Sequence, residues 1–261
     1  MVTMKAMHIS LMRRMRALWG MGALILAISI SAHAAVPTLA QRIAAARSTA
    51  NSAHNACSAI RPFYWQVGDV LGVLAAGSLD RAGHRGEPTY NAHTVMAIAS
   101  ASKWLFAAYV VQRKQGRLTP EQISMLNFTS GYTRFRFCRR GQTIAACLRQ
   151  PGNGTRVNSE IGVFYYGGGH MQELAARLGL GHDDDAEMAA ALRDELGADI
   201  RLYFLRPQPA GGAAMDAAAY ARFLRAMMDG RLLLGRMLDA DAVCADPGTC
   251  PHLASHSPVP A

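Results

Sequence analysis

The chain has 261 residues, 51% of them hydrophobic, and a formal net charge of +9, so it is long enough for one domain with a full-sized core. No basic run with interleaved aromatic residues follows the first 34 residues, which argues against a nucleic-acid-binding protein. The five cysteines have no C-x-x-C spacing, so zinc or dithiol chemistry is not indicated.

Residues 1–34 have the composition of an export signal. Lys5 and three arginines precede an apolar run over residues 17–30, and Ala32-His33-Ala34 offers the small residues that signal peptidase reads. The apolar run is too short for a comfortable membrane span. We therefore expect a signal peptide over 1–34 that is cut near Ala34, and a periplasmic or secreted domain over 35–261 without a membrane span.

Helical patterns dominate the expected domain. An Ala-rich stretch over 39–60 predicts an N-terminal helix, and the apolar segment 69–79 predicts a buried strand followed by a turn. Residues 100–115 predict a helix that ends at Gly116, and Thr119-Pro120-Glu121-Gln122 is a capping box with proline at the first helical position. Further helices are predicted over 168–178, 183–196 and 216–230.

Acidic residues lie at the start of two of these later helices. Asp216 is the expected cap of the last helix, in which Phe223 and Leu224 are expected to be buried. The run from His182 to Asp185 has the residue types of a metal cluster, but acids at the positive end of a helix explain it better. We expect no metal and no cofactor.

All five cysteines fall in the expected exported part, where disulfides form. The pairs Cys138–Cys147 and Cys244–Cys250 close short loops and are candidate disulfides, although the sequence does not fix the connectivity. The remaining cysteine, Cys57, is then either a free thiol or a residue whose partner this chain does not contain.

The segment Ser100-Ala101-Ser102-Lys103 carries the most specific chemistry. Residues three apart at the start of a helix lie on one face, so Ser100 and Lys103 are expected to be within reach of each other. A serine hydroxyl needs a neighbouring base to become a nucleophile, and a lysine serves as that base only as a neutral amine. After residue 34 every basic residue except Lys103 and Lys114 is arginine, which cannot take this proton. The alternative interpretation is a serine cap followed by a solvated lysine.

Four segments together resemble the class C β-lactamase family, which includes serine β-lactamases, D-Ala-D-Ala peptidases and esterases. Residues 98–119 are similar to its nucleophile helix, and 126–132 to its L-x-x-x-T-S-G turn. Residues 164–170 resemble its Tyr-x-Asn element, and 209–223 its Ala-Gly-Gly loop with the following helix. The segments occur in the family's order over about residues 65–235.

The resemblance implies a role for each of four residues. Ser100 is the acylated nucleophile, Lys103 accepts its proton, and Tyr166 passes a proton to the leaving group. Gly168 stands at the substrate-binding position where the family usually has asparagine, so the side-chain amide is missing here. The K-[ST]-G or H-x-G strand of the family is not found in residues 230–261, and we expect a chain that is truncated at its C-terminal strands.

The fold class implied is α/β (α+β): a β-lactamase/DD-peptidase-like antiparallel sheet flanked by helices, plus a helical region that bears Tyr166. The expected function is that of an exported serine hydrolase, which acts through an acyl-enzyme on a small-molecule or peptide substrate with an amide, β-lactam or ester bond. The protein is expected to be a monomer. The alternative is a non-catalytic exported binding protein that keeps the scaffold, because a fold alone does not determine function.

Overall fold

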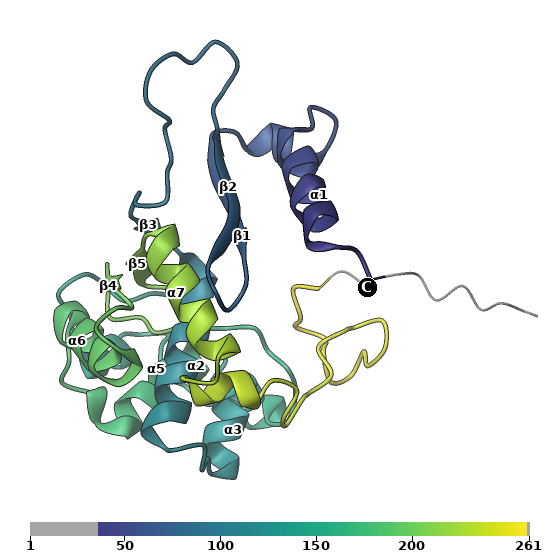
Figure 1. The fold of residues 1–261 in the computed structure, drawn as a ribbon. Helices are drawn as coiled ribbons and strands as arrows, with labels where there is room; N and C mark the ends of the chain where they lie inside the picture. Colours follow the sequence, from purple (N-terminus) through teal and green to yellow (C-terminus); the bar gives the residue numbers. More distant parts are fainter. Residues whose placement is uncertain (1–35, 260–261) are drawn as a thin grey trace, which may run out of the picture. The chain divides into compact units, whose positions relative to one another are not determined.

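The computed structural model describes residues 36–259, which combine helices with short antiparallel strands (Figure 1). The mixed α/β class expected from the sequence is confirmed. The expected signal peptide lies outside the described residues, and within them no helix is long and apolar enough to cross a membrane. The helices are α1 (Leu39–Asn51), α2 (Ser102–Arg113), α3 (Pro120–Leu126), α4 (Ile144–Leu148), α5 (Gly169–Ala175), α6 (Asp185–Leu196) and α7 (Ala217–Met228).

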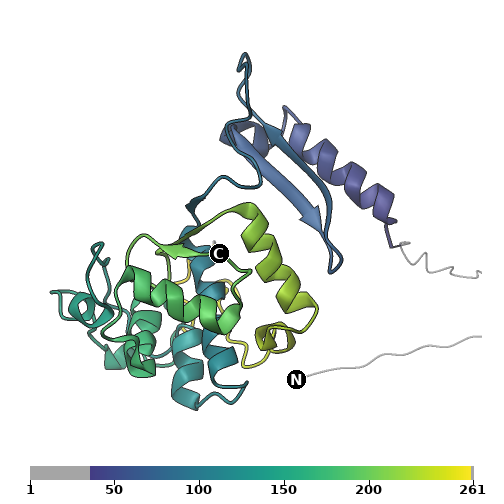
Figure 2. The same cartoon turned by 60° about the vertical axis from the view of Figure 1, so that its left-hand side comes forward.

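The first two strands form an antiparallel hairpin, β1 (Phe63–Gly68) with β2 (Val73–Leu79). Helix α1 contacts both strands and lies beside them in both views (Figures 1 and 2). The prediction of one strand over 69–79 was wrong in its first part, because residues 69–72 form the turn of this hairpin. The Oδ1 atom of Asp69 accepts hydrogen bonds from the backbone N–H groups of Leu71 and Gly72, at 2.8 and 3.1 Å, which stabilises a turn over a straight strand.

A second antiparallel sheet has the order β3-β5-β4, from β3 (Met96–Ala97), β4 (Tyr203–Phe204) and β5 (Ala213–Met215). Its central strand β5 is entirely buried. The strand continues into α7 through Asp216, whose Oδ1 atom accepts a hydrogen bond from the N–H of Ala219 at 2.6 Å. The predicted cap at Asp216 is therefore confirmed, and it sets the direction in which α7 leaves the sheet.

The hydrophobic core is built mainly from α2, α5, α6 and α7. Phe106 and Tyr109 on α2 are fully buried, as is Phe223 on α7. Leu224, which was expected to be buried with Phe223, is instead 38% exposed. A helix turns by about 100° per residue, so the position after Phe223 on α7 is rotated away from the face that Phe223 buries.

Several predicted helix ends are confirmed because they depend on local capping contacts. Thr119 begins α3 with a reciprocal capping box, as predicted. Asp184 caps α6 through Ala186 and Glu187, so the acidic run before this helix stabilises its N-terminus. The N-terminal helix is shorter than predicted: α1 ends at Asn51, and a separate 3-10 turn covers Ala56–Ile60.

The two candidate disulfides are both present. Cys138 is bonded to Cys147 and Cys244 to Cys250, while Cys57 is a free thiol in the described chain. Disulfides persist in oxidising compartments, so these two bonds are consistent with an extracellular or periplasmic protein.

Candidate active site

Ser100 lies in a 3-10 turn, Ala99–Ala101, directly before α2. The helix was predicted to start at Ser100 itself, and the structure begins it two residues later. Ala99 has a φ of 43°, in the left-handed region that favours glycine, so the backbone before Ser100 is strained. Strain of this kind persists only where neighbouring contacts maintain it.

Buried Ser102 provides those contacts. Its hydroxyl donates a hydrogen bond to the Ala99 carbonyl at 2.5 Å and accepts one from the Ala213 N–H at 3.1 Å. The Ala213 carbonyl in turn accepts from the Ile98 N–H at 3.0 Å. The turn that presents Ser100 to solvent is thus tied to the buried strand β5.

Lys103, one helical turn after Ser100, points back toward it. The Nζ atom donates to Ser100 Oγ at 2.9 Å and to the carbonyl of Ala210 at 2.8 Å. Lys103 is half-buried, whereas Ser100 is exposed. The contact expected from the spacing of the two residues is therefore present, and the alternative of a fully solvated lysine does not describe this side chain.

Tyr166 completes the group. The Lys103 Nζ atom lies 4.4 Å from the centroid of the Tyr166 ring, which is 38% exposed. Burial raises the pKa of Tyr166, but the polar contacts with Ser100 and Lys103 and the positive charge of Lys103 lower it by more. The net pKa lies below that of an ordinary tyrosine, which makes this phenol a better proton donor.

Backbone hydrogen bonds on both sides fix the strand-like segment that carries Tyr166. The N–H of Tyr165 donates to the Phe128 carbonyl at 2.9 Å, and the N–H of Phe164 donates to the Leu253 carbonyl at 2.6 Å. The ring of Tyr165 packs on His256, with 4.6 Å between ring centroids. The C-terminal segment that follows the Cys244–Cys250 disulfide therefore supports the tyrosine segment from one side.

His170 supports the same segment from the other side. It is fully buried, its Nδ1 atom accepts a hydrogen bond from Ser130 Oγ at 2.7 Å, and its Nε2 atom donates to the Tyr165 carbonyl at 3.0 Å. Both bonds are made together by the neutral Nε2–H tautomer. Desolvation lowers the pKa of His170 to about 4, against weaker raising effects of the Tyr165 carbonyl and of Glu160.

This shift makes stability depend on pH. The unfolded chain binds a proton at His170 near pH 6.5 and the folded chain only near pH 4, so the free energy of unfolding falls as the pH drops through this window, by about 3 kcal/mol in all. We expect urea denaturation at pH 7, 5 and 4 to show this loss in wild type and in the exposed-site control His54→Gln, but not in His170→Gln. An equal loss in His170→Gln would contradict the assignment.

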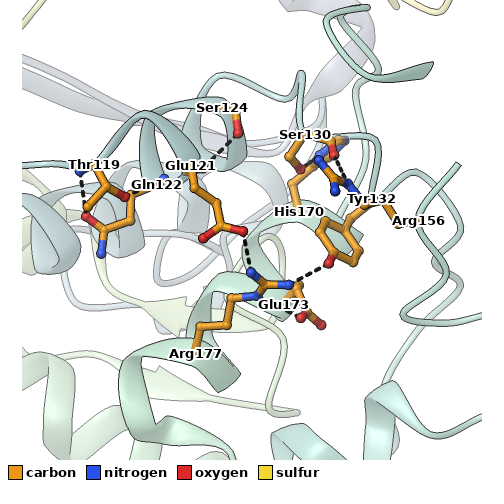
Figure 3. Close-up of polar contacts among 10 residues, drawn as sticks. All are labelled: Thr119, Glu121, Gln122, Ser124, Ser130, Tyr132, Arg156, His170, Glu173 and Arg177. Carbon is orange, nitrogen blue, oxygen red and sulfur yellow. Dashed lines mark hydrogen bonds and ion pairs between the residues drawn. The ribbon is translucent and has the colours of Figure 1, made fainter. Parts of the chain in front are cut away.

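A charged network lies beside this histidine (Figure 3). Arg177 donates through Nε to Glu173 at 2.8 Å, through a terminal nitrogen to Tyr132 Oη at 2.5 Å, and also contacts Glu121. These contacts join Glu121 on α3 and Glu173 on α5 to Tyr132, so the network holds three parts of the fold together and is structural. Within the described residues no group of three or more histidines, cysteines or acids lies together as metal ligands would.

A cavity of about 300 Å³ opens beside Ser100, Lys103 and Tyr166. Apart from these three residues its wall is apolar. Trp104 and Ala107 come from α2, and the remaining lining residues come from three other segments of the chain: Leu126 and Phe128, Met171, and Leu234 and Leu238. The predicted catalytic residues therefore share one apolar cavity.

Gly168 is not among the residues that line this cavity. A Cβ atom at position 168 would lie 2.8 Å from the Phe135 ring, so a larger residue would require that ring to move.

The Ala210 carbonyl that accepts a hydrogen bond from Lys103 was not predicted from the sequence. A carbonyl belongs to every residue and leaves no mark in a sequence, although the neighbouring Gly211-Gly212 pair indicates a close backbone approach.

No family model matches the chain, and no curated protein matches it. A solved structure to which it is similar is described as "putative beta-lactamase from Bacteroides dorei DSM 17855", with 17% sequence identity and a TM-score of 0.44. The match covers 63% of this chain and 56% of the other, so it spans little more than half of that protein's length. A similarity of this size is not evidence of a shared activity.

Proposed function

We propose that the protein is an exported serine hydrolase that acts through an acyl-enzyme on Ser100. One observation supports this proposal above all: Lys103 Nζ is 2.9 Å from Ser100 Oγ and also contacts the Tyr166 ring, at the mouth of an apolar cavity. A nucleophile, a base and an acid within reach of one another are the parts that acyl transfer needs.

In the proposed reaction Lys103, as a neutral amine, takes the proton of Ser100 while Oγ forms a bond to the acyl carbon of the substrate. The bond to the leaving group then breaks, Tyr166 gives that group a proton, and the proton that Lys103 took from Ser100 passes to Tyr166 and restores its hydroxyl. Water releases the acyl group and restores the serine hydroxyl. The backbone N–H of Ser100, at the start of its turn, is a candidate donor to the developing oxyanion.

Labelling with a fluorescent fluorophosphonate tests this proposal, because the probe reacts covalently with activated serines. We expect wild type and Ser124→Ala to be labelled and Ser100→Ala to remain unlabelled, while circular dichroism shows that all three are folded. A folded wild type that takes no label would contradict the proposal and favour a non-catalytic binding protein on the same scaffold.

A further inference from the structure

The wall of the cavity carries information about the substrate that the three proposed catalytic residues do not. Six of its side chains are large and apolar, and the last of them is 53% exposed: Trp104, Leu126, Phe128, Met171, Leu234 and Leu238. Such a surface is favourable for an apolar group, since each methylene taken out of water there strengthens binding roughly fourfold when it is fully buried.

The charge distribution in the cavity also favours a neutral substrate group. Among the described residues that line it, Lys103 has the one basic side chain, and no acid lines it. The Nζ atom of Lys103 already donates to Ser100 Oγ and to the Ala210 carbonyl. The neutral amine that the proposed reaction requires at Lys103 has no charge to pair with a substrate carboxylate, so a carboxylate there would lose water without gaining an ionic partner.

From this wall and this charge distribution we infer that the substrate carries a neutral, apolar acyl group longer than acetyl, which lies in the cavity while Ser100 attacks its carbonyl. The inference rests on the proposed function and narrows its substrate class. In the ester substrates of the test below, the C–O bond breaks, the alcohol leaves with a proton, and water then hydrolyses the acyl-serine, so no co-reactant other than water is needed.

A matched set of p-nitrophenyl esters tests the inference. The acetate, the pentanoate and the hemisuccinate differ in acyl length and in terminal charge, and the last two have similar lengths. With the rate of Ser100→Ala subtracted, we expect kcat/KM for the pentanoate to exceed that for the acetate, and that for the hemisuccinate, by about tenfold or more.

A wall variant shows whether this cavity is responsible. Leu238→Asp places a charge at a partly exposed position of the wall, and we expect the pentanoate-to-acetate ratio to fall by about fivefold or more. Leu71→Asp is the matched control: Leu71 is 91% exposed at the hairpin turn, does not line the cavity, and should leave the ratio unchanged.

The outcomes separate this inference from the proposed function. If Ser100 reacts with the fluorophosphonate but the three esters are cleaved equally well, or the hemisuccinate best, the inference is wrong and the serine hydrolase proposal stands. If neither labelling nor hydrolysis depends on Ser100, both are wrong. If Leu71→Asp changes the ratio as much as Leu238→Asp does, the cavity is not the acyl site.

Discussion

Replacement of Lys103 by arginine is expected to slow the acylation of Ser100 by roughly 100- to 10,000-fold, the usual contribution of a positioned general base. Arginine keeps the positive charge and has a side chain long enough to approach Ser100, but it does not give up a proton in a protein and so cannot accept one from the serine. The substitution therefore separates proton transfer from simple electrostatic attraction.

The rate of fluorophosphonate labelling measures this effect. Lys114→Arg is the matched control, because Lys114 follows the other end of the same helix α2 and has no part in the proposed site. We expect Lys114→Arg to be labelled as fast as wild type. Labelling of a folded Lys103→Arg at the wild-type rate would rule out Lys103 as the base.

The largest expected effect on stability is that of Phe223→Ala. Phe223 is fully buried in the core, with the ring of Tyr220 at a centroid distance of 5.7 Å. Removing a buried phenylalanine ring loses its burial and leaves a cavity, which together lower the free energy of unfolding by about 3–5 kcal/mol. The same core holds β5, and β5 holds the Ser100 turn through Ser102.

The neighbouring position on α7 provides the control. Leu224 is 38% exposed, so we expect Leu224→Ala to lower the free energy of unfolding by less than about 1 kcal/mol. Urea denaturation of wild type and both variants measures the difference. Equal losses in the two variants would show that Phe223 is not a core residue.

The parts of the structure that were predictable depend on contacts between residues close in the sequence. At both helix caps, Thr119 and Asp216, the side chain accepts a hydrogen bond from the backbone N–H of the residue three positions later. The Ser100–Lys103 contact likewise follows from one helical turn. Each of these predictions needed no knowledge of how distant segments pack.

The strands were harder to predict because some are very short and one is followed along the chain by an apolar turn that resembles a strand. In the hairpin turn Val70 and Leu71 are apolar yet 47% and 91% exposed, so hydrophobicity alone extends the predicted strand across the turn. Asp69 before Gly72 was the signal that could have located it. Strands β3 and β4 have two residues each, too few for any alternating pattern.

The site was predictable only in part for a related reason. Tyr166 was predicted as a site residue only because its segment resembles that of a known family. In the structure its ring lies beside Lys103. The Ala210 carbonyl and the two leucines 234 and 238 reach the site through tertiary packing. Nothing in a sequence distinguishes a leucine that lines a cavity from one that packs in a core or lies on the surface.

The central claim is that Ser100 is an activated nucleophile, and the most direct measurement is the location of a covalent adduct. After reaction of the wild-type protein with a fluorophosphonate, intact mass and peptide sequencing by mass spectrometry should find one adduct per chain, on the hydroxyl of Ser100. An adduct on another serine, or a folded protein of unchanged mass, would contradict the mechanism proposed for this site.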